Sequence, residues 1–189
     1  MKPDVAKHIK ESISVKQQIL GSLIPQIEKA ASAAADCLKQ GHKLLFFGNG
    51  GSASDSQHLA AEFVGRYEKE RRALSAIALT TDTSILTAVG NDYGYERIFE
   101  RQIEALGQKG DVLFAISTSG HSKNVLKGVQ KAKAMGLYTI GLTGGTGGEL
   151  KTQVDLPLVI PSKKTSRIQE SHILIGHIIC ECVDELLMS

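Results

Sequence analysis

The hydrophobic pattern of the chain changes near residue 42. Before that point, apolar residues recur at helical spacing: Val5, Ile9 and Ile13 lie four positions apart, and an alanine-rich stretch follows in residues 27–38. Gly41 is expected to end the second of two helices. Because helices that precede an α/β core have little of that core to cover, part of their apolar face is expected to contact another subunit.

After residue 42, short apolar runs alternate with helical segments. The runs lack polar alternation, which is typical of parallel strands covered on both faces. Strands are predicted at residues 44–47, 74–79, 112–116, 138–142 and 156–160. Helices are predicted near residues 54–65, 83–89, 95–106, 122–135, 149–152 and 166–188. The alternation predicts an α/β fold with a doubly wound five-stranded parallel sheet flanked by helices. Residues 1–189 would form one domain, with leading helices in 1–41 and the core in 42–189.

The composition argues against several classes of protein. Lys and Arg total 22 against 20 Asp and Glu, a net charge of +2 without the basic face of a nucleic-acid binder. The apolar runs are too short to span a bilayer, and the N-terminus lacks the apolar core of a signal peptide. Three cysteines without CxxC spacing do not favour a disulfide framework. We therefore expect a soluble cytoplasmic protein with no nucleic-acid or membrane partner.

Three loops rich in Gly, Ser and Thr follow predicted strands, at the sheet edge where such folds bind ligands. Backbone N–H groups, hydroxyls and a following helix N-terminus together bind anions. Turn formation would account for any one of these loops, but two hydroxyl-rich loops at one edge favour phosphate binding. The loops comprise residues 48–56, 117–124 and 143–148.

These loops do not fit the common nucleotide-binding motifs well. A Walker-type motif does not follow the first strand. Gly48, Gly50 and Ala53 match the loose dinucleotide pattern G-x-G-x-x-A, but the acidic residue expected after the second strand is missing, since Asp82 comes late. The four hydroxyls in residues 117–122 suit a compact phosphomonoester better than a pyrophosphate. A nicotinamide-dependent dehydrogenase is therefore disfavoured.

Two pairs of polar residues are candidates for proton transfer or metal binding. His58 and Glu62 lie on one helix face, and Gln169 and His177 lie two turns apart on the last helix. Each has a structural alternative: the first pair could be a surface couple, and His177 a histidine satisfied in the core. Two His, one Glu and one Gln would also suit a zinc-like divalent ion, provided that the two helices meet.

Two further polar segments have an open interpretation. Arg66 and the pair Arg71 and Arg72 could steer an anionic substrate or could be solvated. Asn91 and Asp92 lie in a turn-forming run that would end one helix before the next begins.

Four segments together have the pattern of a known family. They are residues 47–62 (Phe-Gly-Asn-Gly-Gly-Ser-Ala-Ser-Asp-Ser-Gln-His-Leu-Ala-Ala-Glu), 90–94 (Gly-Asn-Asp-Tyr-Gly), 116–120 (Ile-Ser-Thr-Ser-Gly) and 167–170 (Arg-Ile-Gln-Glu). They resemble the phosphoheptose isomerases of the sugar isomerase (SIS) fold, and the resemblance covers nearly the whole chain. The Ser-Thr-Ser-Gly loop is shared across SIS domains and indicates only a sugar phosphate, whereas the combination of segments is more specific.

The resemblance implies a role for each matching residue. The phosphate would be held by Ser117, Thr118, Ser119 and Ser122. The sugar would be lined by Asn49, Gly50, Gly51, Asn91, Asp92 and Gln169. A zinc ion would be held by His58, Glu62, Gln169 and His177. Glu62 would be the catalytic base and His177 its acid partner. One departure is Ser166, where some members of the family have Asp.

The resemblance also implies the reaction. The chain would convert sedoheptulose 7-phosphate to D-glycero-D-manno-heptose 7-phosphate through an enediol(ate), in ADP-heptose and lipopolysaccharide core biosynthesis, as a homotetramer. Glu62 cannot be a tight ligand and a free base at once, so a loosely held zinc ion is expected. The alternative is a non-catalytic SIS protein that binds a sugar phosphate or a replication-initiation partner, and the intact pair of Glu62 and His177 argues against it.

Overall fold

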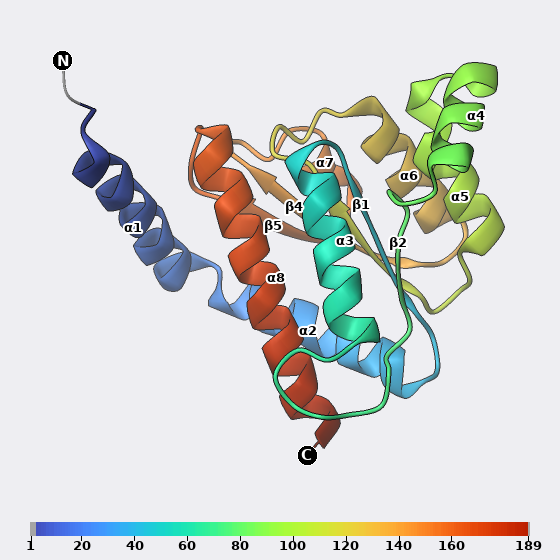
Figure 1. Cartoon of the computed structure of the whole chain (residues 1–189), viewed down its shortest axis with the longest axis horizontal. Coiled ribbons are helices and arrows are strands. Elements are labelled where there is room, and N and C mark those ends of the chain that lie inside the picture. The colour runs from blue at the N-terminus through green and yellow to red at the C-terminus, as the bar shows by residue number, and fades with distance from the viewer. Residues whose placement is uncertain (1–2, 189) are drawn as a thin grey trace.

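The computed structural model describes residues 3–188 and shows one five-stranded sheet between two layers of helices (Figure 1). Residues 1, 2 and 189 of the predicted domain lie outside the described residues. In chain order, the elements are α1 (Val5–Ser22), α2 (Ile24–Lys39), β1 (Leu44–Gly48), α3 (Gly51–Val64), β2 (Ala76–Ala78), α4 (Thr83–Tyr93), the 3₁₀ turn η1 (Tyr95–Arg97), α5 (Ile98–Leu106), β3 (Val112–Ile116), α6 (Lys123–Ala134), β4 (Tyr138–Gly144), α7 (Leu150–Gln153), β5 (Leu156–Ile160) and α8 (Thr165–Met188).

The sheet is parallel throughout, with strand order β2-β1-β3-β4-β5. The direction of winding reverses between β1 and β3, because the chain first adds β2 on one side of β1 and then β3 on the other. In doubly wound sheets the crevice at such a reversal, outside the carboxyl ends of the strands, is the usual ligand site. The predicted doubly wound parallel sheet is confirmed, and the loops that follow β1 and β3 meet at this crevice.

The central strands are apolar throughout because both of their faces are covered. β1 and β3 are buried along their whole length. On one face, the ring of Phe46 stacks on Phe114 with centroids 4.8 Å apart, and on Phe63 of α3 at 5.9 Å. On the other face, Phe47 packs against Phe99 of α5 at 4.7 Å. Successive residues of one strand therefore supply two separate hydrophobic cores.

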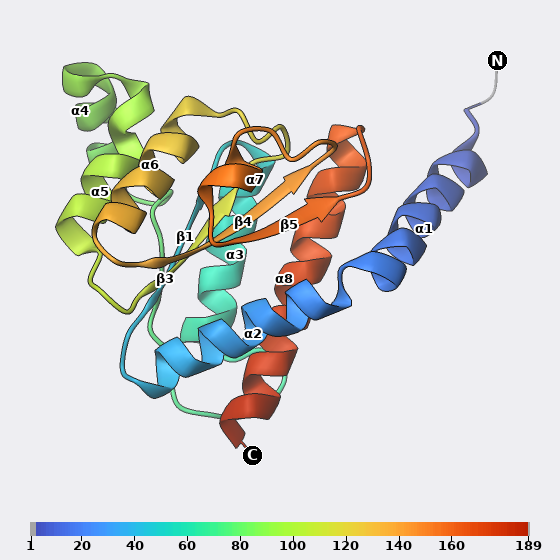
Figure 2. The same ribbon diagram turned by 180° about the vertical axis from the view of Figure 1, so that it is seen from behind.

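The two faces of the sheet carry different helices. Helices α2, α3 and α8 cover one face, and α4, α5, α6 and α7 cover the other (Figures 1 and 2). α8 packs against both α2 and α3. Its closest approach to α3 is at Gly176, where an added Cβ would lie 2.5 Å from a methyl carbon of Leu59. Glycine at this position therefore allows α3 and α8 to lie side by side.

The leading helices leave part of their apolar surface uncovered. α2 is followed by Gly41 at φ 81°, as its sequence predicts, and packs on the sheet and α8. α1 projects from the rest of the fold (Figure 2), with Val5 61% and Leu20 68% exposed. An apolar groove of about 570 Å³ lies between α1, α2 and α8, and Ile13 and Ile178 are among the residues that line it.

Several predicted elements differ from the structure: the helix predicted near 54–65 begins three residues earlier, at Gly51, the strand predicted at 138–142 extends to Gly144, and three further elements change more. The strand predicted at residues 74–79 is limited to Ala76–Ala78, because it is an edge strand and the N–H of Leu74 donates to Phe63 O at the end of α3. The helix predicted from residue 95 begins as a 3₁₀ turn. The helix predicted over residues 83–89 continues to Tyr93 and ends before Gly94, at φ 90°. The turn expected at residues 91–95 therefore begins only after α4.

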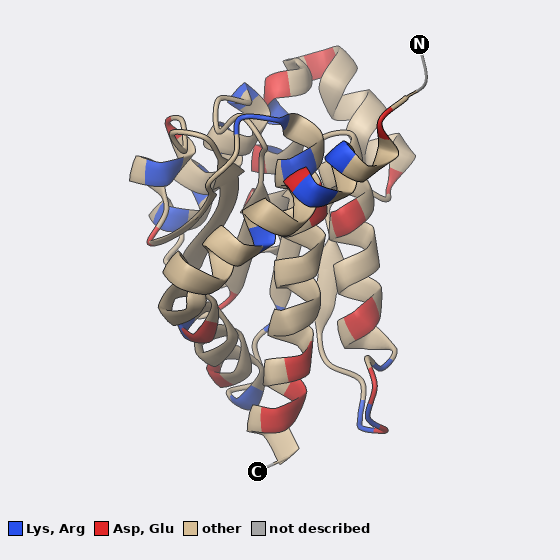
Figure 3. Cartoon of the chain, turned by 90° about the vertical axis from the view of Figure 1, so that its left-hand side faces the viewer, with Lys and Arg blue, Asp and Glu red and all other residues tan. Residues whose placement is uncertain are grey.

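Acidic and basic residues are interspersed along the helices, in keeping with the small net charge (Figure 3). Within residues 3–188, no helix combines the length and apolar character that crossing a membrane requires.

A buried histidine on α8 couples the stability of the fold to pH. His172 is fully buried, and its Nε2 lies 3.2 Å from the carbonyl oxygen of Thr143, to which it can only donate. Nδ1 is then unprotonated, and it has no hydrogen-bond partner among residues 3–188. Burial lowers the pKa of His172 to about 4, because a charged imidazolium would lack solvation there.

We predict that this histidine makes the protein less stable in acid. Below about pH 6.5 the unfolded chain binds a proton at residue 172 that the folded chain excludes, so the free energy of unfolding falls as the pH falls toward 4. At about pH 5, the free energy of unfolding should be about 2 kcal/mol lower than at neutral pH. The variant His172→Gln keeps an N–H donor and cannot titrate, so its urea unfolding curves at pH 7 and pH 5 should differ less than those of the wild type.

The exposed His8 offers a matched control, and His8→Gln should retain the full acid effect. Equal losses in His172→Gln and wild type would contradict the assignment to His172.

Candidate active site

A pocket of about 530 Å³ opens at the carboxyl ends of β1 and β3. Its walls come from three parts of the chain: the loop and first turns of α3, the loop after β3, and the start of α8. The lining residues are Asn49, Gly51, Ser52, Ser54, Asp55, Thr118, Thr165, Ser166 and Gln169. The pocket thus lies at the reversal of winding order, where the topology of the sheet places a ligand.

Glycines shape the first wall of the pocket. Gly50 adopts φ 56°, a left-handed conformation that turns the chain from β1 directly into α3. An added Cβ at Gly48 would lie 2.6 Å from Ser52 Cβ, so glycine is needed for the close approach of strand and helix. Because the first residues of α3 line the pocket, the positive end of the helix dipole faces it.

Asn49 is fixed by a reciprocal pair of amide hydrogen bonds. Its Nδ2 donates to Asn124 Oδ1 at 2.9 Å, and Asn124 Nδ2 donates to Asn49 Oδ1 at 2.8 Å. The hydroxyl of Tyr95 also donates to Asn49 Oδ1, at 3.3 Å. Sequence reasoning missed Asn124, although it stands at the end of the hydroxyl-rich run 117–124. The pair ties the loop after β1 to the first turn of α6.

The loop after β3 is a compact turn held together by its own hydroxyls. The hydroxyl oxygens of Ser117 and Ser122 lie 3.1 Å apart, and Ser117 Oγ accepts from the N–H of Gly120. Ser119 Oγ accepts from the N–H of His121, and Thr118 lines the pocket. Ser122 precedes α6, so a second helix N-terminus begins at this turn. The arrangement suits a phosphate, which needs many N–H and O–H donors in a small space.

The third predicted phosphate loop, residues 143–148, supports the second loop rather than lining the pocket. The N–H of Leu150 donates to Gly120 O at 3.0 Å. Gly148, at φ 58°, lies so close behind the turn that an added Cβ would be 2.6 Å from Ser119 O. The glycines of this loop therefore allow backbone to pack against backbone. Sequence spacing cannot distinguish this role from anion binding.

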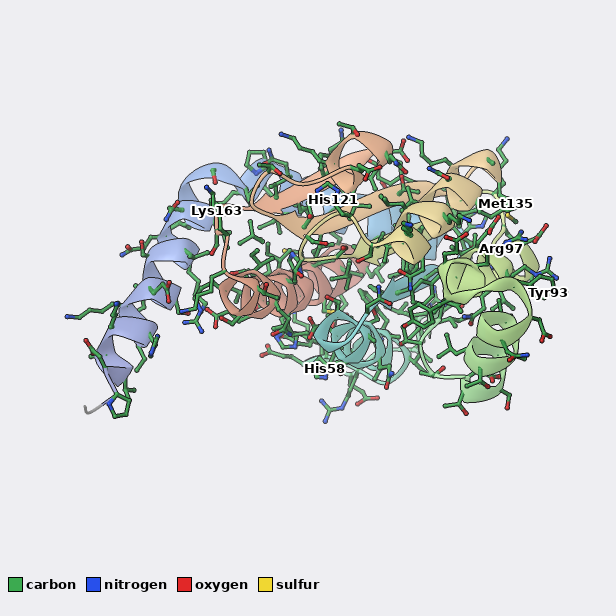
Figure 4. All side chains as sticks on the ribbon, turned by 90° about the horizontal axis from the view of Figure 1, so that it is seen from above. His58, Tyr93, Arg97, His121, Met135 and Lys163 are labelled. Carbon is green, nitrogen blue, oxygen red and sulfur yellow. The ribbon has the colours of Figure 1, made fainter. Side chains whose placement is uncertain are left out.

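The pairs predicted from spacing alone meet across α3 and α8. His58 Nε2 lies 2.8 Å from His177 Nε2 and 3.2 Å from Glu62 Oε1, and one potential ligand atom from each residue lies within 4.8 Å of the others. Figure 4 shows His58 on α3, next to α8. Ligands held at 2.0–2.1 Å by a tetrahedral ion lie roughly 3.3 Å apart, so this donor set fits a divalent ion. Tyr67 packs over His177 with ring centroids 5.8 Å apart.

Gln169 is oriented by a carboxylate that sequence reasoning missed. Its Nε2 donates to both oxygens of Asp55, at 2.8 and 2.9 Å, which leaves Oε1 as its remaining ligand atom. Burial raises the pKa of Asp55 above the usual Asp range, and the hydrogen bonds from Gln169 offset part of the rise. The sequence did contain an indication of this role, because Asp55 precedes His58 by three residues on α3 and so lies on the same helix face.

Other predicted residues do not line this pocket in the single chain. Asn91 and Asp92 are exposed in the last turn of α4, and Asn91 Nδ2 donates to Asp92 Oδ1 at 2.8 Å. In Figure 4, the neighbouring Tyr93 lies near one edge of the view, to one side of His58. Arg66 is exposed and pairs with Glu70 at 3.6 Å. The roles implied for Asn91 and Asp92 stay predictions.

The model of the SIS domain family matches residues 7–144. The phosphoheptose isomerase of Clostridium acetobutylicum is 52% identical over 189 residues, which cover 99% of this chain and 96% of that protein. The phosphoheptose isomerase of Aquifex aeolicus is 54% identical over 183 residues, which cover 97% and 96%. The chain belongs to the phosphoheptose isomerases.

Solved structures of the family share this fold. The phosphoheptose isomerase of Neisseria gonorrhoeae superposes with a TM-score of 0.91 at 46% identity, covering 96% of this chain and 97% of the other. The enzyme from Francisella tularensis gives 0.93 at 41% identity, covering 96% of each chain. The family resemblance found in four short segments therefore extends over the whole three-layer architecture, including the two leading helices.

We predict that Asp55 supports metal binding through Gln169. In Asp55→Ala the amide of Gln169 loses its acceptor and can rotate, so the affinity for Zn²⁺ should fall by about 10-fold. Calorimetric titration of the purified protein with Zn²⁺ measures this directly, and Asp82→Ala, which changes a carboxylate at the start of α4, serves as the control. Wild-type affinity in Asp55→Ala would show that Gln169 needs no such partner.

Proposed function

We propose that the chain interconverts sedoheptulose 7-phosphate and D-glycero-D-manno-heptose 7-phosphate. The chain is a sugar-phosphate isomerase by its family. The observation that carries the proposal is the convergence of His58, Glu62 and His177. These three residues do not line the 530 Å³ pocket themselves, but His58 and His177 act electrostatically on Asp55, which does. Aldose–ketose isomerisation of a sugar phosphate needs a site that binds the phosphate and acid–base groups close to the reacting carbons.

The phosphate would be held by the turn after β3. Ser117, Thr118, Ser119 and Ser122 supply hydroxyls there, and the N-terminus of α6 adds a favourable dipole. These contacts are remote from the reacting carbons, so their binding energy orients the open-chain sugar for reaction. Asn49, Gly50 and Gly51 would line the sugar, since they form the neighbouring wall.

Proton transfer would be shared between Glu62 and His177. Glu62 removes a proton from C1 of the open-chain ketose and returns it to C2. His177 donates a proton to the oxygen on C2 and accepts one from the oxygen on C1, which leaves both residues as they started. Each residue therefore carries no more than one transferred proton at any stage. Glu62 lies on α3 and His177 on α8, and their ligand atoms lie close together.

A zinc ion would be held by His58, Glu62, His177 and the Oε1 of Gln169. When bound, it supplies positive charge that stabilises the enediolate. Glu62 then has two functions, ligand and base, and it is half-buried, with a side chain 21% exposed. We therefore expect Glu62 to hold the ion only loosely, since the carboxylate needs a free oxygen to accept the carbon-bound proton.

The assembly we propose is a homotetramer in the cytoplasm, feeding heptose-containing glycans such as the lipopolysaccharide core. The exposed apolar side chains of α1 and the groove beside them support contact between subunits. Cys37, Cys180 and Cys182 are free thiols, which suits a reducing compartment. The sugar-binding role implied for Asn91 and Asp92 is part of the proposal, although neither residue lines the pocket of its own chain.

We predict that Glu62→Gln abolishes isomerisation while sugar-phosphate binding persists. The amide keeps the shape of the side chain but cannot accept the carbon-bound proton, so turnover should fall by about 100-fold or more. Proton NMR of sedoheptulose 7-phosphate in D₂O follows both product formation and entry of deuterium at C2. The exposed Glu68 provides the control, since Glu68→Gln changes the same group outside the site.

Near-normal turnover by Glu62→Gln would contradict the role of the base. A wild-type protein that binds the sugar phosphate without converting it would instead support the non-catalytic alternative.

We predict that a charge on the exposed face of α1 dissociates the assembly. Ile9 is 56% and Ile13 49% exposed in the single chain, and burying each in a subunit contact contributes about 1–2 kcal/mol. The double variant Ile9→Glu with Ile13→Glu should therefore elute as a smaller species in size-exclusion chromatography with light scattering. Leu106→Glu, on the exposed side of α5, should leave the mass unchanged, and an unchanged mass in the α1 variant would exclude α1 from the contact.

A further inference from the structure

An arginine outside the pocket holds the end of the helix that carries Glu62. Arg71 lies in the loop between α3 and β2, and its side chain is only 7% exposed. Its two terminal nitrogens donate to the carbonyl oxygens of Glu62 and Phe63, each at 2.9 Å. These carbonyls belong to the last turn of α3, where helix oxygens lack partners within the helix. The solvated alternative considered for Arg71 is therefore wrong, whereas Arg72 beside it is exposed.

The same guanidinium reaches across to the helix that carries His177. Arg71 Nε donates to Asp184 Oδ1 at 2.5 Å, and the side chain of Asp184 is 3% exposed. Asp184 follows His177 by seven residues on α8, which is two helical turns and the same face. Figure 1 shows the loop after α3 passing by the lower part of α8. One side chain thus contacts the backbone of the base on one helix and a carboxylate on the other.

Two contacts link the part of α3 that carries Glu62 to α8. The first is the close approach of Leu59 to Gly176, next to His58 and His177 in the sequence. The second is the bridge from Arg71 to Asp184. Glu62 follows Leu59 by three residues on α3, and its own carbonyl oxygen is one of the two that Arg71 binds. Its position relative to His177 therefore depends on both contacts.

We propose that Arg71 and Asp184 are positioning residues, which hold Glu62 against His58 and His177 in the geometry that metal binding and proton transfer need. The proposal rests on the isomerase function proposed above. A buried ion pair adds little to stability, because desolvation of both charges offsets their attraction. The planar guanidinium of Arg71 donates hydrogen bonds in fixed directions from three nitrogens at once. The single ammonium nitrogen of a lysine cannot reproduce this geometry.

The test compares Arg71→Lys with the wild type. Lysine keeps the charge but cannot bind Asp184 and both carbonyls together, so the last turn of α3 loosens around Glu62. The affinity for Zn²⁺, measured by calorimetry, and kcat with sedoheptulose 7-phosphate should each fall by about 10-fold or more. KM should change by less than about threefold, because the phosphate-binding turn lies at the other end of α3. Arg72→Lys is the matched control and should behave as the wild type.

Thermal unfolding followed by circular dichroism identifies variants that are folded at the assay temperature. A folded Arg71→Lys with wild-type kcat and Zn²⁺ affinity would overturn the proposal. So would equal changes in KM and kcat, since a general loosening of the fold disturbs both. If Arg71→Lys does not fold, Asp184→Asn removes only the charge of the partner, and the same two readouts decide.

The metal titration also separates this proposal from the function on which it rests. A wild-type protein that binds Zn²⁺ but does not convert the sugar contradicts the isomerase function. In that case the Zn²⁺ affinities of Arg71→Lys and Asp184→Asn still support or overturn the role of Arg71.

Discussion

The close packing of α3 on α8 is the constraint on which the candidate site depends. His58 and His177 are 119 residues apart in the sequence, yet their Nε2 atoms lie 2.8 Å apart. Gly176 favours this packing, because an added Cβ there would lie 2.5 Å from a methyl carbon of Leu59. A larger residue at that position would force Leu59 to shift or the helices to move apart, which would disturb the donor set that they carry.

The sheet topology gives this pair of helices its location. The reversal of winding between β1 and β3 opens a crevice, and two helix N-termini begin at its edge. Those N-termini offer backbone N–H groups and partial positive charge, which suit a phosphate. Two side chains of the site are oriented by hydrogen bonds to a second residue: Asn49 is bonded to Asn124, and Gln169 to Asp55. The pocket is thus largely organised before any ligand arrives.

The two loops rich in glycine and hydroxyl residues that follow β3 and β4 have different structural roles. The loop after β3 presents hydroxyls, while the loop after β4 packs its backbone against the rear of that turn. Both look alike in composition, because a close approach to a phosphate and a close approach to another backbone require the same small residue. Arg71 shows a similar ambiguity: a basic residue in a charged loop proves to be buried against helix carbonyls and Asp184.

The sequence by itself determined the parallel α/β sheet, since uninterrupted apolar runs between helical segments have few other solutions. It also pointed to His58, Glu62, Gln169 and His177 as a donor set, through helical spacing and family motifs, and the structure brings the ligand atoms of His58, Glu62 and His177 together. Only the tertiary structure decided that α3 and α8 meet, that Asp55 and Asn124 orient site residues, and that Asn91 does not line the pocket of its own chain. Such contacts depend on packing between distant segments, which local periodicity does not encode.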